Sequence, residues 1–405
     1  MIDETFLSPV GDSPTTARLV YGAHALESLK LLEDGSVNAI CTSPPYWGLR
    51  DYGTANWKGG DPNCNHSTSS YSDNMTPHVD RPSGGHRGGT NKFCTHCGAE
   101  RVDLQIGLED ELEDYLESLV QLFDECKRVL RKDGTLWLNL GDTYSRGSRD
   151  TVDSQGGLCA SNSDSIKYEF SSPSANLGGH PTIKPKDLIG VPWRVALALQ
   201  KAGWYLRNDI IWSKGNPMPE SVKDRFTKSH EYIFLFAHPD SGGRYYFDSD
   251  AVREPCSPTS MKDLHRRKTL NNKGGGDGSF EDVRADLTRN RTEYFQEGGV
   301  RNRRTVWDVN TKPYSGAHFA VWPTELVELM VLAGSPKGGT VLDPFSGSAT
   351  TGEVALSCGR NYVGLDLNPE YFGLAKCRVQ GIKVGKPKSV VPELSILDIF
   401  GVADD

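Results

Sequence analysis

VLDPFSGSATTG, at residues 341–352, has the pattern of a buried strand that turns sharply into a helix. Gly347 lets the backbone of the turn approach a ligand closely, and the start of a helix presents free amide donors. The next strand-like run, residues 361–365, leads to Asp366, where a carboxylate can accept hydrogen bonds from ribose hydroxyls. This unit indicates a nucleoside-binding site in a Rossmann-like core, with a plain strand-to-helix turn as the alternative.

The residues of the turn indicate which class of ligand it could bind. It lacks the GxGxxG pattern of dinucleotide sites and the lysine of a P-loop. Asp343, at the predicted strand end, would repel a pyrophosphate but attract a cation. The amino group or sulfonium of S-adenosylmethionine meets that requirement, so we expect this compound as the cofactor.

Helices and strands alternate on both sides of this unit, which predicts an α/β fold with a mostly parallel, doubly wound sheet. The predicted helices are 25–32, 110–130, 192–202, 324–333 and 351–358. The predicted strands are 36–41, 135–140, 206–212, 229–236, 340–342 and 361–365, with a turn at 132–134.

Three long segments interrupt the alternation, near residues 53–100, 145–183 and 250–305. Loops of this length in a compact domain are usually functional or disordered. We therefore expect one domain with insertions. Its parts are a catalytic-motif half (15–52), a Cys/His insertion (53–103), core with a Ser/Gly-rich loop at 145–183 (104–248), a target-recognition segment (249–305), a cofactor-binding half (306–385) and a tail (386–405).

Ser43-Pro44-Pro45-Tyr46 follows the predicted strand 36–41, at the sheet edge where open α/β sheets bind ligands. The amino group of cytosine or adenine is a poor nucleophile because its lone pair is delocalised into the ring. A hydroxyl and a backbone carbonyl that accept its two hydrogen bonds draw the nitrogen toward tetrahedral geometry. The rigid proline pair fixes the carbonyl, and Tyr46 offers a ring for a base taken out of the duplex. Taken alone, the motif fits a proline-rich turn equally well.

In this order the two motifs resemble the beta group of DNA amino-methyltransferases, in which the catalytic tetrapeptide precedes the cofactor turn. The resemblance covers most of the chain and includes residues 136–142, 208–236 and 318–323. It implies a circularly permuted Rossmann-like methyltransferase and direct methyl transfer to a flipped base. The implied catalytic residues are Ser43, Pro44, Pro45 and Tyr46. The implied cofactor residues are Phe319, Pro323, Asp343, Phe345, Ser346, Gly347, Ser348, Asp366 and Asn368.

Ser43 bears on the target base. In the beta group, serine at this position generally accompanies methylation of cytosine N4, whereas aspartate or asparagine is more usual for adenine N6. We expect cytosine N4 in double-stranded DNA, with adenine N6 as the first alternative. RNA or a protein amide as substrate stays open. So does a non-catalytic, zinc-containing DNA-binding protein, although this would leave the Asp343–Asp366 pair unexplained. The resemblance also leaves open a homodimer and a cognate restriction endonuclease.

A cluster of metal-ligand residues lies in the first insertion. Cys64 and His66 precede a Cys-x-x-Cys pair, Cys94 and Cys97, that is followed by glycine, and this spacing is typical of a zinc knuckle. The insertion has little apolar content, so a structural Zn²⁺ would explain how it is ordered. His78, His86 and His96 are alternatives to His66, and a flexible loop with incidental thiols is the competing interpretation.

Positive charge gathers locally in a chain of formal net charge −8. Residues 252–304 hold twelve Lys or Arg and eight Asp or Glu. Six of them are dense enough to contact phosphates: Arg266, Arg267, Lys268, Arg301, Arg303 and Arg304. The resemblance also places target recognition between Phe236 and His318. The alternative is a solvated loop.

Composition sets the remaining expectations. At 405 residues and 37% hydrophobic content, the chain is long enough for a large core, and it has no apolar run of the length that spans a membrane. The acidic N-terminus lacks the pattern of a signal peptide. We expect a cytoplasmic protein without a membrane partner.

Overall fold

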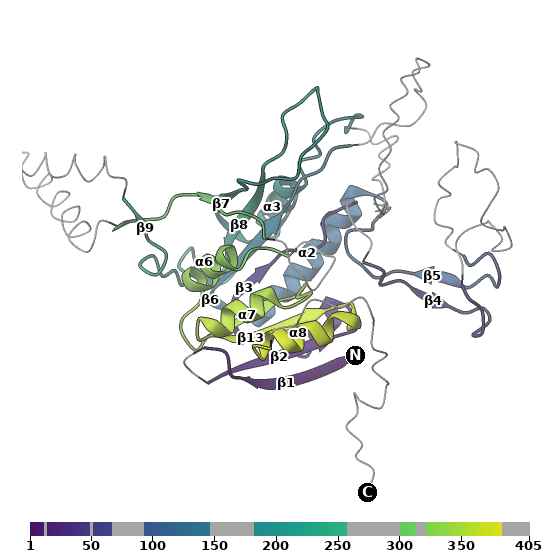
Figure 1. Cartoon of the computed structure of the whole chain (residues 1–405), viewed down its shortest axis with the longest axis horizontal. Helices are drawn as coiled ribbons and strands as arrows, with labels where there is room; N and C mark the ends of the chain where they lie inside the picture. Colours follow the sequence, from purple (N-terminus) through teal and green to yellow (C-terminus); the bar gives the residue numbers. More distant parts are fainter. Residues whose placement is uncertain are drawn as a thin grey trace, which may run out of the picture.

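A nine-stranded mixed sheet, in the order β1-β2-β13-β12-β3-β6-β8-β7-β11, organises the computed structural model of the chain (Figure 1). The structure describes residues 1–11, 14–48, 52–66, 93–145, 182–256, 300–312 and 321–382. Five neighbouring pairs are parallel, namely β2–β13, β13–β12, β12–β3, β3–β6 and β11–β7. The pairs β1–β2, β6–β8 and β7–β8 are antiparallel. The predicted α/β class with a mostly parallel sheet is confirmed.

The strands of the main sheet come from almost the whole described chain. They are β1 (Ile2–Ser8), β2 (Thr15–Tyr21), β3 (Val37–Thr42), β6 (Leu130–Leu140), β7 (Tyr205–Ser213), β8 (His230–Ala237), β11 (Val306–Asp308), β12 (Thr340–Asp343) and β13 (Asn361–Asp366). Two small sheets stand apart, β4 (Asn56–Lys58) with β5 (Glu100–Val102), and β9 (Glu254–Pro255) with β10 (Val300–Arg301).

Helices cover both faces of the sheet, as expected for a doubly wound fold. One buried cluster contains side chains of α1 (Ala25–Leu29), α2 (Leu112–Val129) and α3 (Val191–Lys201). The other contains side chains of α6 (Thr324–Gly334), α7 (Thr350–Ser357) and α8 (Phe372–Val379). Two short 3-10 turns, η1 (Pro239–Ser241) and η2 (Pro369–Tyr371), complete the elements.

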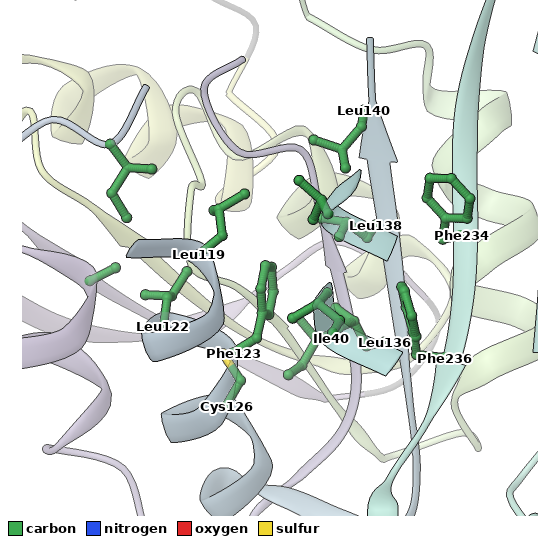
Figure 2. Packing of buried hydrophobic residues seen from close by; sticks show 14 of the residues in the cluster. Ile40, Leu119, Leu122, Phe123, Cys126, Leu136, Leu138, Leu140, Phe234 and Phe236 are labelled. Carbon is green, nitrogen blue, oxygen red and sulfur yellow. The ribbon is translucent and has the colours of Figure 1, made fainter. Parts of the chain in front are cut away.

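Alternation along β3 shows why both faces are apolar. Ile40 belongs to the cluster under α2, whereas Ala39 and Cys41 belong to the opposite cluster. Figure 2 shows Ile40 beside Leu136 and Leu138, with Leu119 and Phe123 reaching toward them from the helix. A strand buried on both faces reads as a continuous apolar run, which is how this strand was recognised in the sequence.

Two parts of the sheet differ from the sequence expectation. The predicted turn at 132–134 lies within β6, which starts at Leu130 and runs directly on from α2. Because Val37 pairs with Leu130 and Ala39 with Thr135, the residues between form a bulge, so the glycine and charges mark an irregularity in the strand. The first strand, β1, lies ahead of the expected core start at residue 15 and forms the sheet edge.

Candidate active site

A cavity of about 540 Å³ opens at the carboxyl ends of β3, β12 and β13 and receives both predicted motifs. All four residues of the tetrapeptide line it, together with Asp343, Phe345, Gly347 and Asp366 of the cofactor turn and the following strand. Parallel strands bring residues 300 positions apart to one edge, because β3 and β12 are direct neighbours. The two motifs therefore share a single site.

The side chains of the tetrapeptide are held by polar groups of β6 and β8. The Tyr46 hydroxyl lies 2.8 Å from Glu231 Oε2 and 3.0 Å from Asn139 Oδ1. Burial raises the pKa of this phenol well above its ordinary value, and the charge of Glu231 adds to the effect. The hydroxyl therefore stays protonated and donates a hydrogen bond to one of these two oxygens. This bond fixes the tyrosine ring against the strand.

Ser43 is placed to act as a hydrogen-bond acceptor. Its hydroxyl lies 3.3 Å from Asn139 Oδ1, to which it donates, and 3.3 Å from the Tyr46 hydroxyl. The Asn139 amide is oriented by its own donation to the Tyr232 carbonyl, at 3.1 Å. Because the serine hydrogen is used inside the protein, the Oγ lone pairs remain for a ligand N–H.

The two proline carbonyls have different environments. The Pro45 carbonyl accepts a hydrogen bond of 3.0 Å from the Tyr115 hydroxyl of α2. In the part of the chain that the structure describes, no donor reaches the Pro44 carbonyl. Pro45 has no N–H, and its carbonyl is occupied by the Tyr115 hydroxyl. The carbonyl of Pro44, next to Ser43, is therefore available to accept a hydrogen bond from a ligand.

Asp343 is buried beneath the cofactor turn. Its carboxylate accepts hydrogen bonds from Thr42 Oγ1 (2.6 Å), Thr351 Oγ1 (2.7 Å) and the Phe345 amide (3.1 Å). Burial raises the pKa of this carboxyl to about 6, although these hydrogen bonds oppose the shift. Asp343 thus braces the turn and contributes negative charge to the cavity, two roles that the sequence did not separate.

Asp366 lies across the turn from Asp343, at the end of β13. It accepts hydrogen bonds from the Gly347 amide (2.7 Å) and the Asn368 amide (2.9 Å). Burial again raises the carboxyl pKa to about 6. Each oxygen has accepted one hydrogen bond, so each retains capacity for a hydroxyl of a ligand.

The side chains of the other predicted cofactor residues contact either the cavity or the protein core. Phe345 and Ser348 line the cavity, and the Ser348 hydroxyl accepts a hydrogen bond of 2.9 Å from Arg378. The Ser346 hydroxyl instead lies 2.7 Å from the Tyr21 hydroxyl and 2.8 Å from that of Tyr362, inside the core. Ser346 therefore presents its backbone to the cavity and supports the turn from below.

Two predicted cofactor residues precede α6. Pro323 is buried at the helix start, while its neighbours Val321 and Trp322 line the cavity. Phe319 lies outside the described residues. The role of this segment in covering the cofactor stays a prediction.

Several cavity residues were not assigned to the site from the sequence: Asn139, Glu231, Lys214, Tyr52, Gln105 and Tyr371. The first three lie in the runs 136–142 and 208–236 that carry the resemblance, but no role was given to them, and the other three lie outside every recognised run. Glu231 is tied to Lys214 by an ion pair of 2.5 Å, and the Lys214 ammonium lies 4.3 Å from the centre of the Trp212 ring. Glu231 stands two residues before the buried run of β8, and this position was the available signal, because a carboxylate beside an apolar strand requires a partner.

The predicted metal ligands converge. The ligand atoms of Cys64, His66, Cys94 and Cys97 all lie within 4.8 Å of one another. The Cys64 and Cys94 sulfurs are 3.9 Å apart, and tetrahedral thiolates at zinc–sulfur bonds of about 2.3 Å would be separated by about 3.8 Å. His66 completes the group, not His96, while His78 and His86 lie outside the described residues.

The backbone around the cluster explains its geometry. The amide of Cys94 donates to Ala99 and that of Gly98 to Cys94, which closes the knuckle turn. Gly60 has a φ of +74°, and a Cβ there would lie 2.7 Å from the Cys97 sulfur. Only glycine fits this close approach, a requirement that the sequence alone did not reveal.

Three of the predicted DNA-binding residues lie in the described part of the chain, and their side chains contact other residues of the protein. Arg301 and Arg304 both pair with Glu254, at 2.8 and 2.6 Å, and Arg303 donates to the Val252 carbonyl at 2.9 Å. Arg266, Arg267 and Lys268 lie outside the described residues. Phosphate contact by this segment stays a prediction.

Residues 37–377 match the profile of a family described as DNA methylase, the N6/N4 methyltransferases. The chain belongs to this DNA methylase family. Among the described residues, no helix combines the length and apolar character needed to cross a membrane.

Relatives align along most of the chain. The Type II methyltransferase M.Cfr9I of Citrobacter freundii is 40% identical over 362 residues, covering 89% of this chain and 87% of its own. The Type II methyltransferase M.SmaI of Serratia marcescens is 39% identical over 355 residues, covering 88% of each chain. The solved structure of PvuII DNA methyltransferase (cytosine-N4-specific) superposes with a TM-score of 0.50 and 14% identity, covering 97% of this chain and 93% of that one. This last likeness concerns the fold alone, a Rossmann-like α/β fold with a mostly parallel sheet.

Proposed function

We propose that the protein methylates the N4 amino group of a cytosine in double-stranded DNA, with S-adenosylmethionine as the methyl donor. One observation carries the proposal: the Ser43–Tyr46 tetrapeptide and the Asp343–Asp366 pair line the same cavity. The order of the two motifs is that of the beta group. Cytosine is preferred over adenine N6 because the first tetrapeptide residue is Ser43.

The cavity fits a cationic nucleoside. The buried carboxyl of Asp343 and the half-buried carboxyl of Asp366 supply negative charge, and Phe345, Trp322 and Tyr371 supply apolar and aromatic surface. S-Adenosylmethionine carries an ammonium, a sulfonium and ribose hydroxyls, and when bound it supplies an electrophilic methyl group. We propose that Asp366 accepts the ribose hydroxyls, while Gly347 allows the nucleoside close to the backbone.

The tetrapeptide prepares the nucleophile. The target base flips out of the duplex and stacks on Tyr46, whose ring is fixed by Glu231 and Asn139. Ser43 Oγ and the Pro44 carbonyl accept the two amino hydrogens, so the nitrogen lone pair turns out of the ring plane. The nitrogen then forms a bond to the methyl carbon as the carbon–sulfur bond breaks, and the sulfonium becomes a neutral thioether. The nitrogen loses one proton afterwards, so no covalent intermediate with the protein is required.

We also propose that Cys64, His66, Cys94 and Cys97 bind a structural Zn²⁺. The distances among their ligand atoms support this, and four protein ligands leave no open position for catalysis. Zinc would hold the antiparallel pair β4–β5, whose residues are all exposed or half-buried. Arg266, Arg267, Lys268, Arg301, Arg303 and Arg304 stay proposed as phosphate contacts.

The names of the related proteins suggest a partner for this one. Because two of them are named Type II methyltransferases, we propose a cognate restriction endonuclease that cleaves the same site when it is unmethylated. A cytoplasmic location and a homodimer remain predictions.

Transfer of tritium from labelled S-adenosylmethionine to plasmid DNA tests the activity, and mass analysis of the nucleosides separates N4-methylcytosine from N6-methyladenine. Sequencing of the modified bases then maps the recognised site. Ser43→Ala and Tyr46→Ala are expected to abolish transfer while cofactor binding, measured by calorimetry, persists. Ser36→Ala and Tyr205→Ala, on exposed residues outside the cavity, are the matched controls. Full activity in both tetrapeptide variants would refute the mechanism.

A further inference from the structure

The connection between β7 and β8, residues 214–229, lies at the mouth of the active site; we call it the β7–β8 loop. It leaves β7 at the same sheet edge as the cavity, because β7 runs antiparallel to β8 and β8 antiparallel to β6. Lys214, its first residue, and Glu231, just beyond its last, both line the cavity. Figure 1 shows the teal chain extending past the ends of β7 and β8.

The loop is anchored at several points along its length. The Lys214 amide donates to the Ser229 carbonyl at 2.8 Å, which closes its base. The Asn216 side chain exchanges two hydrogen bonds of 2.9 Å with the backbone of Thr311. The Lys228 ammonium donates to the Asp142 carbonyl. These contacts fix an irregular segment that has little core of its own.

Two large apolar side chains nevertheless point to solvent from this anchored loop. Phe226 is 97% exposed and Met218 is 87% exposed, the two highest values among the exposed large hydrophobic residues of the described chain. The residue before Phe226 is immobilised, since the Arg225 guanidinium lies 3.8 Å from the centre of the Tyr144 ring and pairs with Glu220 at 2.5 Å. Exposed apolar side chains on a fixed support are characteristic of a contact surface.

The charge of the loop favours a nucleic acid as the partner. Residues 214–229 contain four Lys or Arg and two Asp or Glu in a chain whose overall charge is −8. Lys186, from the segment before α3, adds to this surface and pairs with Asp224 at 2.8 Å. Lys214 and Lys228 are held by Glu231 and by the Asp142 carbonyl, whereas Lys223 and Lys186 are exposed. These two exposed cations are complementary to the phosphates that flank a base in a duplex.

We propose that the β7–β8 loop docks on the duplex and inserts Phe226 into the base stack at the position that the target base leaves. This inference rests on the proposed function, because a base that enters the cavity must first leave the stack. Phe226 is five positions from Glu231 in sequence, so its Cα lies within about 17 Å of the Cα of this cavity residue. Apolar side chains that enter base steps offset the loss of stacking, and a phenyl ring has the required flat shape.

The test compares Phe226→Ala and Phe226→Leu with the wild-type protein on two synthetic duplexes that carry the mapped site. In one duplex the target base is normally paired, and in the other it faces an abasic position. Leu7→Ala is the matched control, since Leu7 is 79% exposed on β1, at the far edge of the sheet. The readouts are kcat/KM for each duplex and the Kd for S-adenosylmethionine.

We expect Phe226→Ala to lower kcat/KM on the paired duplex at least about tenfold, because unstacking costs a few kcal/mol. On the abasic duplex it should approach the wild-type value, since less energy is needed to expose that base. Phe226→Leu should be intermediate, and Leu7→Ala unchanged. Wild-type rates for Phe226→Ala on the paired duplex would overturn the inference. So would an equal loss on both duplexes or a loss of cofactor binding. If the wild-type protein methylates neither duplex, the proposed function itself fails.

Discussion

Gly141 provides a sharp test of how the tyrosine is positioned. An added Cβ at this residue would lie 2.5 Å from Cε2 and 3.0 Å from Cδ2 of Tyr46. Carbon atoms in contact normally stay about 3.5 to 4.0 Å apart, so Gly141→Ala must displace the ring by about 1 Å. Since the Tyr46 hydroxyl lies 2.8 Å from Glu231 and 3.0 Å from Asn139, a shift of that size breaks both contacts.

The expected result is a large loss of turnover with a modest loss of stability. A displacement of about 1 Å in a catalytic group can lower a rate about 100-fold, whereas one extra methyl group in a packed site costs about 1–3 kcal/mol of stability. Cofactor binding should persist, because Gly141 does not line the cavity. Single-turnover tritium transfer, calorimetry with S-adenosylmethionine and thermal unfolding measure the three quantities.

Gly373→Ala is the matched control. Gly373 lies in α8, where an added Cβ meets no atom within 4 Å, so alanine should leave activity unchanged and stabilise the helix by about 0.5–1 kcal/mol. If Gly141→Ala retains activity within about threefold of the wild-type protein, the ring position is not what limits transfer. The positioning argument would then be wrong.

Two further predictions concern pH and metal. Burial raises the pKa of both Asp343 and Asp366 to about 6, so in the folded protein without a ligand it favours their protonated forms. The contribution of these protonated carboxyls to the free energy of unfolding is therefore present at low pH and lost as the pH rises through 6. A cationic cofactor favours the ionised form, so its affinity should fall below pH 6 and its effect on the melting temperature should be larger at pH 7.5 than at pH 5. An affinity that is unchanged between these pH values would contradict this, and Asp366→Asn should bind weakly with a flatter pH profile. Purified protein should contain one Zn²⁺ per chain by elemental analysis, and Cys97→Ser should lose it while Cys358→Ser, outside the cluster, keeps it. A wild-type chain without metal would refute the zinc proposal.

The sequence predicted those parts of the molecule that depend on local pattern. The strand that includes Ile40 and the helix that includes Phe123 were recognised because burial imposes a residue spacing on each. The Cys/His cluster was recognised because metal ligands follow fixed short spacings. The early start of β6 was missed, since a glycine with flanking charges has the same appearance in a bulge and in a turn.

The supporting residues of the site could not be predicted in the same way. Glu231 and Asn139 hold Tyr46 from strands that are 185 and 93 positions away in sequence. No local pattern links such residues, because the contact depends on which strands become neighbours. Ser346 shows the reverse case, since its motif was recognised but its hydroxyl turned out to bond to two core tyrosines.

The hydrogen bond between Thr42 and Asp343 spans 301 positions and joins the two halves of the active site. In the same sheet, β2 near the N-terminus pairs with β13, the last strand of the sheet in sequence. During synthesis on the ribosome, β3 therefore has no β12 neighbour until about 300 further residues have been made. Contacts between distant parts of a chain form slowly, and until then the early strands present unpaired edges. A product truncated before β12 would thus keep the tetrapeptide but lack Asp343 and Asp366, and the cavity would form only after these late strands have joined the sheet.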